Sequence, residues 1–200
     1  MDHSNIITEN QILNTIEKIL VETKSNNDQT HLNSQLLTII KDLIVKQSYV
    51  DRKNKCLNPF NKFGRKCFSQ TDEDGITHEI INRLNIKRGT YAEFGVGDGM
   101  ENNTLLLASL GWKGFWVGGE NIVFDYSAND RFNYTKEWIT LDNITNICKE
   151  NMEKLSIENL DAISLDLDGN DYHFCEALLK KNLNPKLFII EYNSKFFPPI

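Results

Sequence analysis

The chain has 200 residues, 40% of them hydrophobic, which is enough to bury the core of one globular domain with an extension. The net charge is -6, and the excess of acidic side chains lies in residues 71–200, which argues against nucleic acid as the main ligand. Apolar runs are short and interrupted by polar residues, so we expect no signal peptide and no membrane span, and therefore a cytoplasmic protein.

The four cysteines form no CxxC pair and have no histidine at metal-ligand spacing. We therefore interpret Cys56, Cys67, Cys148 and Cys175 as reduced thiols. Neither a zinc site nor a disulfide framework is expected from them.

Residues 9–24 and 34–47 each place Ile and Leu side chains at helical spacing, which predicts two amphipathic helices in an N-terminal extension, residues 1–50. These helices could pair between protomers of a homo-oligomer, or cover the sheet of their own chain. Residues 51–68 are basic and contain phenylalanines, so this segment is either a linker whose rings pack on the domain or a grip for an anionic acceptor or RNA. The main domain is predicted to span residues 69–200.

Helical and strand patterns alternate along the main domain. Apolar residues three or four positions apart predict helices, whereas short runs rich in β-branched and aromatic residues predict strands. The expected helices are 72–85, 101–111, 143–156 and 171–181, and the expected strands are 90–96, 113–118, 136–140, 161–167 and 186–192. Helices between successive strands imply right-handed crossovers, so we predict an α/β fold with a mostly parallel sheet and a ligand at the carboxyl ends of its strands.

The stretch EFGVGDG, residues 93–99, places glycine at every second position directly after the first predicted strand. Glycine permits a tight turn and a close approach of a ligand to the backbone. The spacing is not that of a dinucleotide fingerprint, because the third glycine comes one residue early. Carboxylates in this stretch, at Glu93 and Asp98, suit a cationic ligand better than a pyrophosphate.

This stretch resembles the first motif of class I S-adenosylmethionine-dependent methyltransferases. Together with SQTDEDGITHEIINRL (69–84), LDAISLDLDGNDYHFCEAL (160–178) and KLFIIEYNSKFFPP (186–199), it makes residues 69–199 resemble the FkbM-related methyltransferases. The resemblance implies a Rossmann-like class I methyltransferase sandwich, S-adenosylmethionine as cofactor, and O-methylation of a sugar or another small polar acceptor. It does not cover the predicted N-terminal helices.

The resemblance also implies site residues. Those around the methionine part of the cofactor would be Glu93, Gly95, Gly97, Asp98 and Gly99. Asn103, like Asn102 before it, would bind the ligand or cap the following helix. The acids of SQTDEDG, residues 69–75, would either cover the cofactor entrance or stabilise a helix start.

An acid that accepts both ribose hydroxyls normally follows the second strand of such enzymes directly. Here Gly118 and Gly119 come first and the acid is Glu120, so either the glycines bend the chain to bring Glu120 to the ribose or ribose binding is weakened. Asp142 is expected either at the adenine amino group or at the N-cap of helix 143–156.

Asp166, Asp168 and Asp171 follow the fourth predicted strand, and such carboxylates repel one another unless something compensates. The resemblance places Asp166 beside the reactive methyl group. One alternative is a divalent ion, Mg²⁺ or Ca²⁺, held by the three carboxylates, and another is a turn in which Asp171 caps the next helix. His173 is the candidate general base, and Glu191 is expected at the same rim, where it could hold a polar acceptor.

Two features favour a rival function, a catalytically silent methyltransferase-like module for binding or assembly. One is the displaced acid, Glu120. The other is that the sequence stops at Ile200, where class I domains continue into two further strands, so we expect either a truncated portion or a sheet that lacks them. A third hypothesis is a metal-dependent hydrolase or hydroxylase built on Asp166, Asp168 and Asp171.

Overall fold

The computed structural model describes residues 36, 40, 56–169 and 171–192. The chain divides into one unit that ends at Lys62 and a second that begins at Phe63. Leu36 and Ile40 are helical, but the remainder of the predicted N-terminal extension lies outside the described residues. A short 3-10 helix, η1, spans Asn61–Phe63.

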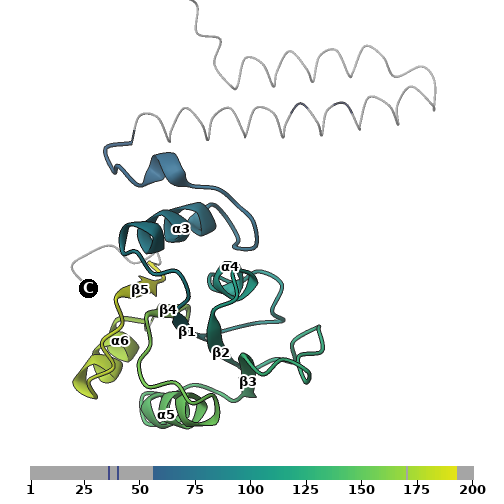
Figure 1. Ribbon diagram of the computed structural model, residues 1–200, viewed down its shortest axis with the longest axis vertical. Helices are drawn as coiled ribbons and strands as arrows, with labels where there is room; N and C mark the ends of the chain where they lie inside the picture. Colours follow the sequence, from purple (N-terminus) through teal and green to yellow (C-terminus); the bar gives the residue numbers. More distant parts are fainter. Residues whose placement is uncertain (1–35, 37–39, 41–55, 170, 193–200) are drawn as a thin grey trace, which may run out of the picture. The chain divides into compact units, whose positions relative to one another are not determined.

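Five parallel strands form the sheet of the second unit, in the order β3-β2-β1-β4-β5 (Figure 1). Their bounds are Thr90–Phe94 for β1, Lys113–Gly118 for β2, Phe132–Lys136 for β3, Ala162–Leu165 for β4 and Leu187–Ile190 for β5. The carboxyl ends of all five therefore lie along one edge. The predicted α/β fold with a mostly parallel sheet is confirmed, and the arrangement is consistent with a Rossmann-like fold.

Helices cover both faces of the sheet (Figure 1). On one face lie α3, Glu73–Arg83, and α4, Leu105–Ser109. On the other lie α5, Ile144–Lys154, and α6, Asp171–Lys180. The sequence predicted each of these helices, with bounds that differ by a few residues because helix ends are defined by caps rather than by apolar spacing.

Strand β1 explains the position of the core, because its residues alternate between the two faces. Ala92 and Phe94 pack in the same cluster as Ile144 of α5, whereas Tyr91 packs with Leu107 of α4. A strand covered on both faces reads as a nearly continuous apolar run, as parallel strands commonly do. The sheet is thus held between two hydrophobic layers, and its carboxyl edge is left for other roles.

The strand predicted at residues 136–140 is wrong. The strand of this region is β3, Phe132–Lys136, and residues 137–140 have no regular structure. Its ladder with β2 ends where Lys136 pairs with Gly118, the last residue of β2, so no partner remains for a continuation. The aromatic residue that suggested a strand, Trp138, is 80% exposed instead.

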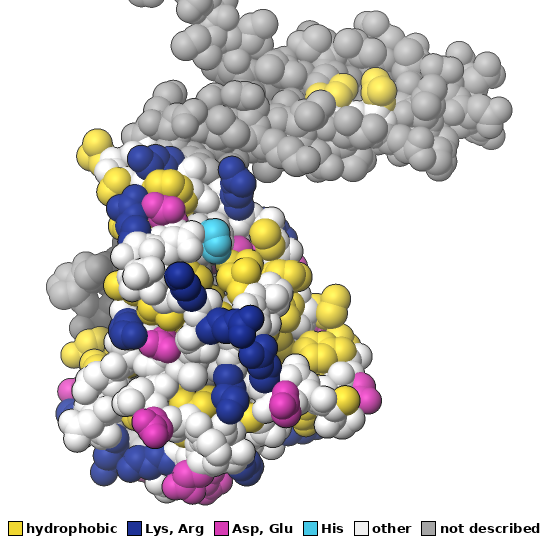
Figure 2. All heavy atoms as spheres, viewed as in Figure 1, with side chains coloured by type: hydrophobic (Ala, Val, Ile, Leu, Met, Phe, Trp, Pro, Cys, Tyr) yellow, Lys and Arg dark blue, Asp and Glu magenta, His cyan; other side chains and the backbone are white. Residues whose placement is uncertain are grey.

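The surface in Figure 2 carries Lys and Arg side chains over the centre of the viewed face. Hydrophobic side chains gather at the side where the segment between β2 and β3 lies, and in that segment Val123 is 61% exposed (Figure 2). None of the described helices is long and apolar enough to span a membrane.

Candidate functional site

The glycine turn after β1 needs two of its glycines for reasons internal to the fold. Gly95 has a φ of +96°, and a Cβ there would lie 1.8 Å from the carbonyl oxygen of Asp166. Gly99 has a φ of +89°, and its Cβ would lie 3.0 Å from the ring of Phe124. Gly97 differs, because it is exposed and, among the described residues other than its chain neighbours, no heavy atom lies within 4 Å of the position of its Cβ. The described structure gives no reason for glycine at residue 97.

The same turn crosses over the end of β2. The backbone N–H groups of Gly95 and Val96 donate to the carbonyl oxygen of Val117, at 3.0 and 3.1 Å. A Cβ on Gly118 would lie 1.9 Å from the carbonyl oxygen of Val96. Glycine at residue 118 is therefore explained by the close approach of the two backbones, in addition to any bend toward Glu120.

Glu93 lies inside the protein, with 3% of its surface exposed. Its carboxylate accepts the backbone N–H groups of Asn103 and Thr104, both at 2.9 Å, and the Thr104 hydroxyl at 2.5 Å. Burial raises the pKa of Glu93, whereas the hydrogen bonds from Thr104 and Asn103 lower it. These bonds satisfy N–H groups just before α4, which a helix start leaves without partners.

The network continues into the neighbouring strands. The indole Nε1 of Trp116 donates to the Thr104 hydroxyl at 2.8 Å, and the side-chain amide of Asn103 donates to Ser164 at 3.3 Å. Trp116 and Ser164 are the residues paired with Glu93 on β2 and β4. Two predicted cofactor ligands, Glu93 and Asn103, are thus engaged in holding α4 against three strands.

Two other predicted ligands, Asp98 and Glu120, are exposed at the carboxyl edge. Asp98 accepts the backbone N–H of Met100 at 2.9 Å, which closes a tight turn next to Gly97. The backbone carbonyl of Glu120 accepts the Tyr134 hydroxyl at 2.5 Å, and this bond fixes the chain two residues beyond β2. The Glu120 carboxylate itself remains at the surface.

Asp142 is also exposed, and it does not cap α5. The N-cap residue is Asn143, whose side-chain oxygen accepts the backbone N–H of Thr140 at 2.7 Å. The capping interpretation of Asp142 is therefore wrong.

Acidic residues gather where β4 and β5 end. Asp171 is buried at the start of α6, and its two oxygens accept the backbone N–H groups of Leu167 and Gly169 at 2.8 and 3.0 Å. Asp168 lies between them with a φ of +57°. Asp171 thus holds the loop after β4 in place, rather than acting as a simple cap of its own helix.

Asp166 and Glu191 lack such support. Burial raises the pKa of the Asp166 carboxyl, and the charges of Asp171 and Asp168 raise it further, while a hydrogen bond with the Glu191 side chain lowers it. Burial and the charge of Asp166 likewise raise the pKa of Glu191. No ion pair with a described Lys, Arg or His joins either group. Together with Asp168 and Asp171, these two residues form an acidic rim at the carboxyl ends of β4 and β5. Its negative charge favours the binding of a proton or another cation.

His173, the predicted general base, forms no ion pair with these carboxylates among the described residues. It is exposed on α6, where its ring packs edge-on against Tyr172 with the centroids 5.5 Å apart. Within residues 56–169 and 171–192, no three His, Cys, Asp or Glu side chains are arranged to hold a metal ion.

The acids before β1 have structural partners. One oxygen of Asp74 accepts the N–H groups of residues 67, 68 and 69, at 2.8, 2.6 and 2.9 Å. Glu73 accepts the backbone N–H and the hydroxyl of Thr71, and its charge also contributes to the raised pKa of Asp166. These residues stabilise the segment before α3 and lie close enough to the acidic rim to influence it.

Sequence reasoning missed Trp138. A Cβ on Gly119 would lie 3.5 Å from its indole ring, so the exposed aromatic surface stands beside the residue that precedes Glu120. The signal was available, because Phe132 and Tyr134 alternate with polar residues and predict a strand that ends before Trp138.

Comparisons of the chain with protein-family models, with curated proteins and with solved structures gave no significant match.

Proposed function

We propose that the protein binds S-adenosylmethionine at the carboxyl ends of β1, β2 and β4 and transfers its methyl group to a sugar or another small polar acceptor. The proposal rests on the resemblance of residues 69–199 to FkbM-related methyltransferases. One structural observation carries it furthest: Gly97 faces open space at the switch point of the sheet, where ligands of open α/β folds bind.

The methionine part of the cofactor would lie against the backbone at Gly97. A Cβ there would have no atom of the described residues beyond its chain neighbours within 4 Å, so a bound ligand is a physical reason for the absence of a side chain. The ribose would be met by Glu120, which is exposed at the end of β2, and the purine would stack on Trp138.

The acidic rim would stabilise the sulfonium. S-adenosylmethionine carries a positive charge on sulfur, whereas the product S-adenosylhomocysteine does not. Asp166 and Glu191 have raised pKa values because burial and neighbouring carboxylates disfavour their charged forms, and a cation would offset that repulsion.

In the proposed reaction, the acceptor oxygen attacks the methyl carbon in line with the carbon–sulfur bond, which breaks to leave S-adenosylhomocysteine. The acceptor proton passes to a carboxylate of the Asp166 and Glu191 pair. This pair fits the role of general base better than His173, because both carboxylates follow strands at the carboxyl edge and have raised pKa values.

The rival function, a silent module that binds without turnover, is favoured by the exposed position of His173, the predicted general base. The two functions share a cofactor site and differ in methyl transfer. Incubation with a mixture of simple sugars and S-adenosylmethionine that carries a radiolabelled methyl group would distinguish them, because only the enzyme transfers the label to a sugar.

The test is isothermal titration with S-adenosylhomocysteine. Wild-type protein is expected to bind with micromolar affinity, and Gly97→Arg to lose binding because its side chain fills the ligand position. Asn146→Arg, an exposed substitution on α5, adds the same charge elsewhere and should bind normally. Trp138→Ala should weaken binding about tenfold, the order expected for one stacking contact. Folded wild-type protein that gives no heat and no thermal shift would overturn the proposal.

A further inference from the structure

A cavity lies on the face of the sheet that carries α4, and two of its walls, Trp116 and Phe124, border Gly99 of the glycine turn. It has a volume of about 520 Å³, within the range of small-molecule sites. Many of the side chains that shape its interior are aromatic, and its lining includes Tyr91, Ala108, Trp116, Phe124, Tyr126 and Phe132. Tyr91 and Phe132 stand near the amino ends of their strands, whereas the glycine turn follows a carboxyl end.

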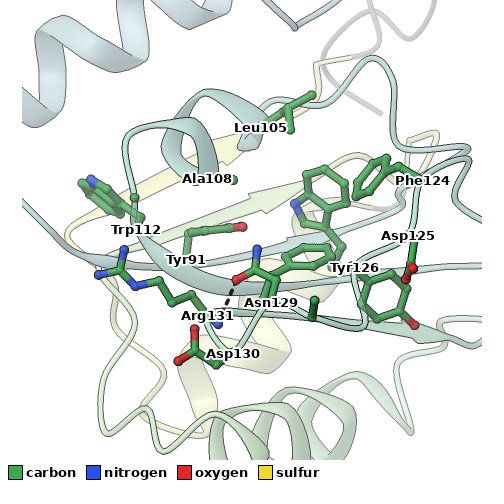
Figure 3. Close-up of a pocket in the computed structure, with 14 residues that line it drawn as sticks. Tyr91, Leu105, Ala108, Trp112, Phe124, Asp125, Tyr126, Asn129, Asp130 and Arg131 are labelled. Atoms are coloured by element: carbon green, nitrogen blue, oxygen red, sulfur yellow. Dashed lines mark hydrogen bonds between the residues drawn. The ribbon is translucent and has the colours of Figure 1, made fainter.

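The cavity contains a buried hydroxyl without a partner. Tyr91 has no exposed surface, and its hydroxyl makes no hydrogen bond in the described structure. In Figure 3 this hydroxyl points toward the middle of the cavity, between Ala108 of α4 and Asn129. A buried hydroxyl without a partner destabilises the protein, and a ligand that accepts its hydrogen bond would remove that penalty. Burial and the nearby charge of Glu93 raise the pKa of Tyr91, so the group remains a donor.

The remaining walls select for shape. Trp116 meets Phe132 edge-on with centroids 4.9 Å apart, and Tyr126 meets the same ring at 5.6 Å. Such walls suit a flat ligand that stacks or packs edge-on. Three charged side chains, Asp125, Asp130 and Arg131, also line the cavity, and all three are exposed, so solvent screens their effect on a ligand.

We propose that this cavity binds a planar, largely apolar small molecule that presents a hydrogen-bond acceptor to the Tyr91 hydroxyl. The inference does not depend on the methyltransferase proposal, because the cavity shares no predicted cofactor residue.

The test uses two bicyclic probes of the same shape in ligand-observed NMR titrations. Isoquinoline, at a pH where its nitrogen is unprotonated, carries an acceptor that naphthalene lacks. Wild-type protein should bind isoquinoline about five- to tenfold more tightly, which is the effect of one hydrogen bond. Tyr91→Phe should bind both probes equally. Absence of binding by both probes, or a preference that survives in Tyr91→Phe, would overturn the proposal.

Two controls locate the site. Ala108→Phe should abolish binding of both probes by filling the cavity, whereas Ser109→Phe, on an exposed neighbouring position of α4, should not. S-adenosylhomocysteine should not displace isoquinoline. Without a probe, Tyr91→Phe should keep or slightly raise the melting temperature, since it removes an unpartnered hydroxyl. A marked fall, or displacement by S-adenosylhomocysteine, would contradict the proposal.

Discussion

The end of β1 and the turn after β4 each carry a carboxylate next to the switch point, but the surroundings of the two groups differ. Glu93, at the end of β1, is buried and receives three hydrogen bonds that fix the start of α4. Asp166, after β4, lies near the carboxylates of Asp171 and Asp168, whose charges raise its pKa, and no described Lys, Arg or His forms an ion pair with it. A carboxylate surrounded by hydrogen-bond donors, such as Glu93, stabilises the fold. A carboxylate close to other carboxylates, such as Asp166, is stabilised when it binds a proton or a cationic ligand.

The same contrast exists among the glycines, and it gives the largest expected effect. Gly95→Ala should cost about 4 kcal/mol or more in free energy of unfolding, because its Cβ would overlap the Asp166 carbonyl at a positive φ. Gly97→Ala should change stability by about 0.5 kcal/mol or less. Urea denaturation followed by circular dichroism measures both. Equal losses in free energy of unfolding for the two variants would contradict the open space beside Gly97.

Removing the Glu93 carboxylate should have the next largest effect. Glu93→Ala leaves the N–H groups of Asn103 and Thr104 and the Thr104 hydroxyl without their acceptor, and should cost about 3 kcal/mol. Glu101→Ala, which removes an exposed ion pair with Lys66, should cost about 0.5 kcal/mol or less. Similar values for both variants would contradict the structural role of Glu93.

Two amide substitutions in the β4 turn should have opposite signs. Asp171→Asn should destabilise the protein by about 1–2 kcal/mol. The side-chain NH₂ that replaces one carboxylate oxygen cannot accept the backbone N–H that this oxygen accepts in the wild type. Asp166→Asn should stabilise it at neutral pH by about 1 kcal/mol or less, since a half-exposed charge is removed from a like-charged cluster. If both variants were destabilised, Asp166 would have an unrecognised partner.

The sign of the pH dependence follows from the same groups. The raised pKa values of Asp166 and Glu191 mean that the folded state binds more protons than the unfolded state, above the ordinary pKa of about 4. Their contribution to stability is therefore present at low pH and is lost as pH rises through the raised pKa values. Thermal melts across this window should show a shallower fall for Asp166→Asn than for wild type.

The smallest expected effect is a difference in pH dependence between the affinities for S-adenosylmethionine and S-adenosylhomocysteine. Because ionised Asp166 and Glu191 would face the sulfonium, affinity for S-adenosylmethionine should rise as pH increases through their pKa values, by several-fold. Affinity for uncharged-sulfur S-adenosylhomocysteine should change less. Parallel pH profiles for the two ligands, measured by calorimetry, would place the sulfur away from the acidic rim.

The sequence predicted the alternation of helices and strands well, since apolar spacing is a local property. The strand predicted at residues 136–140 failed for a non-local reason: β3 can extend only as far as its partner β2, which ends at Gly118. Trp138 has the aromatic side chain of a strand residue, yet its neighbours in space leave it exposed. The alternation of Phe132 and Tyr134 with polar residues is a local signal for β3, whereas the point at which its partner ends is a property of the assembled sheet.

Within the candidate site, the sequence by itself determined that glycines and carboxylates follow two strands that point to the same edge, because parallel crossovers dictate it. Only the tertiary structure decided their roles. It assigns Gly95 and Gly118 to backbone contacts with Asp166 and Val96, leaves Gly97 open, and engages Glu93 with Thr104. The physical reason is that a residue type fixes which bonds a group can form, whereas burial and the approach of distant segments fix which bonds are already made.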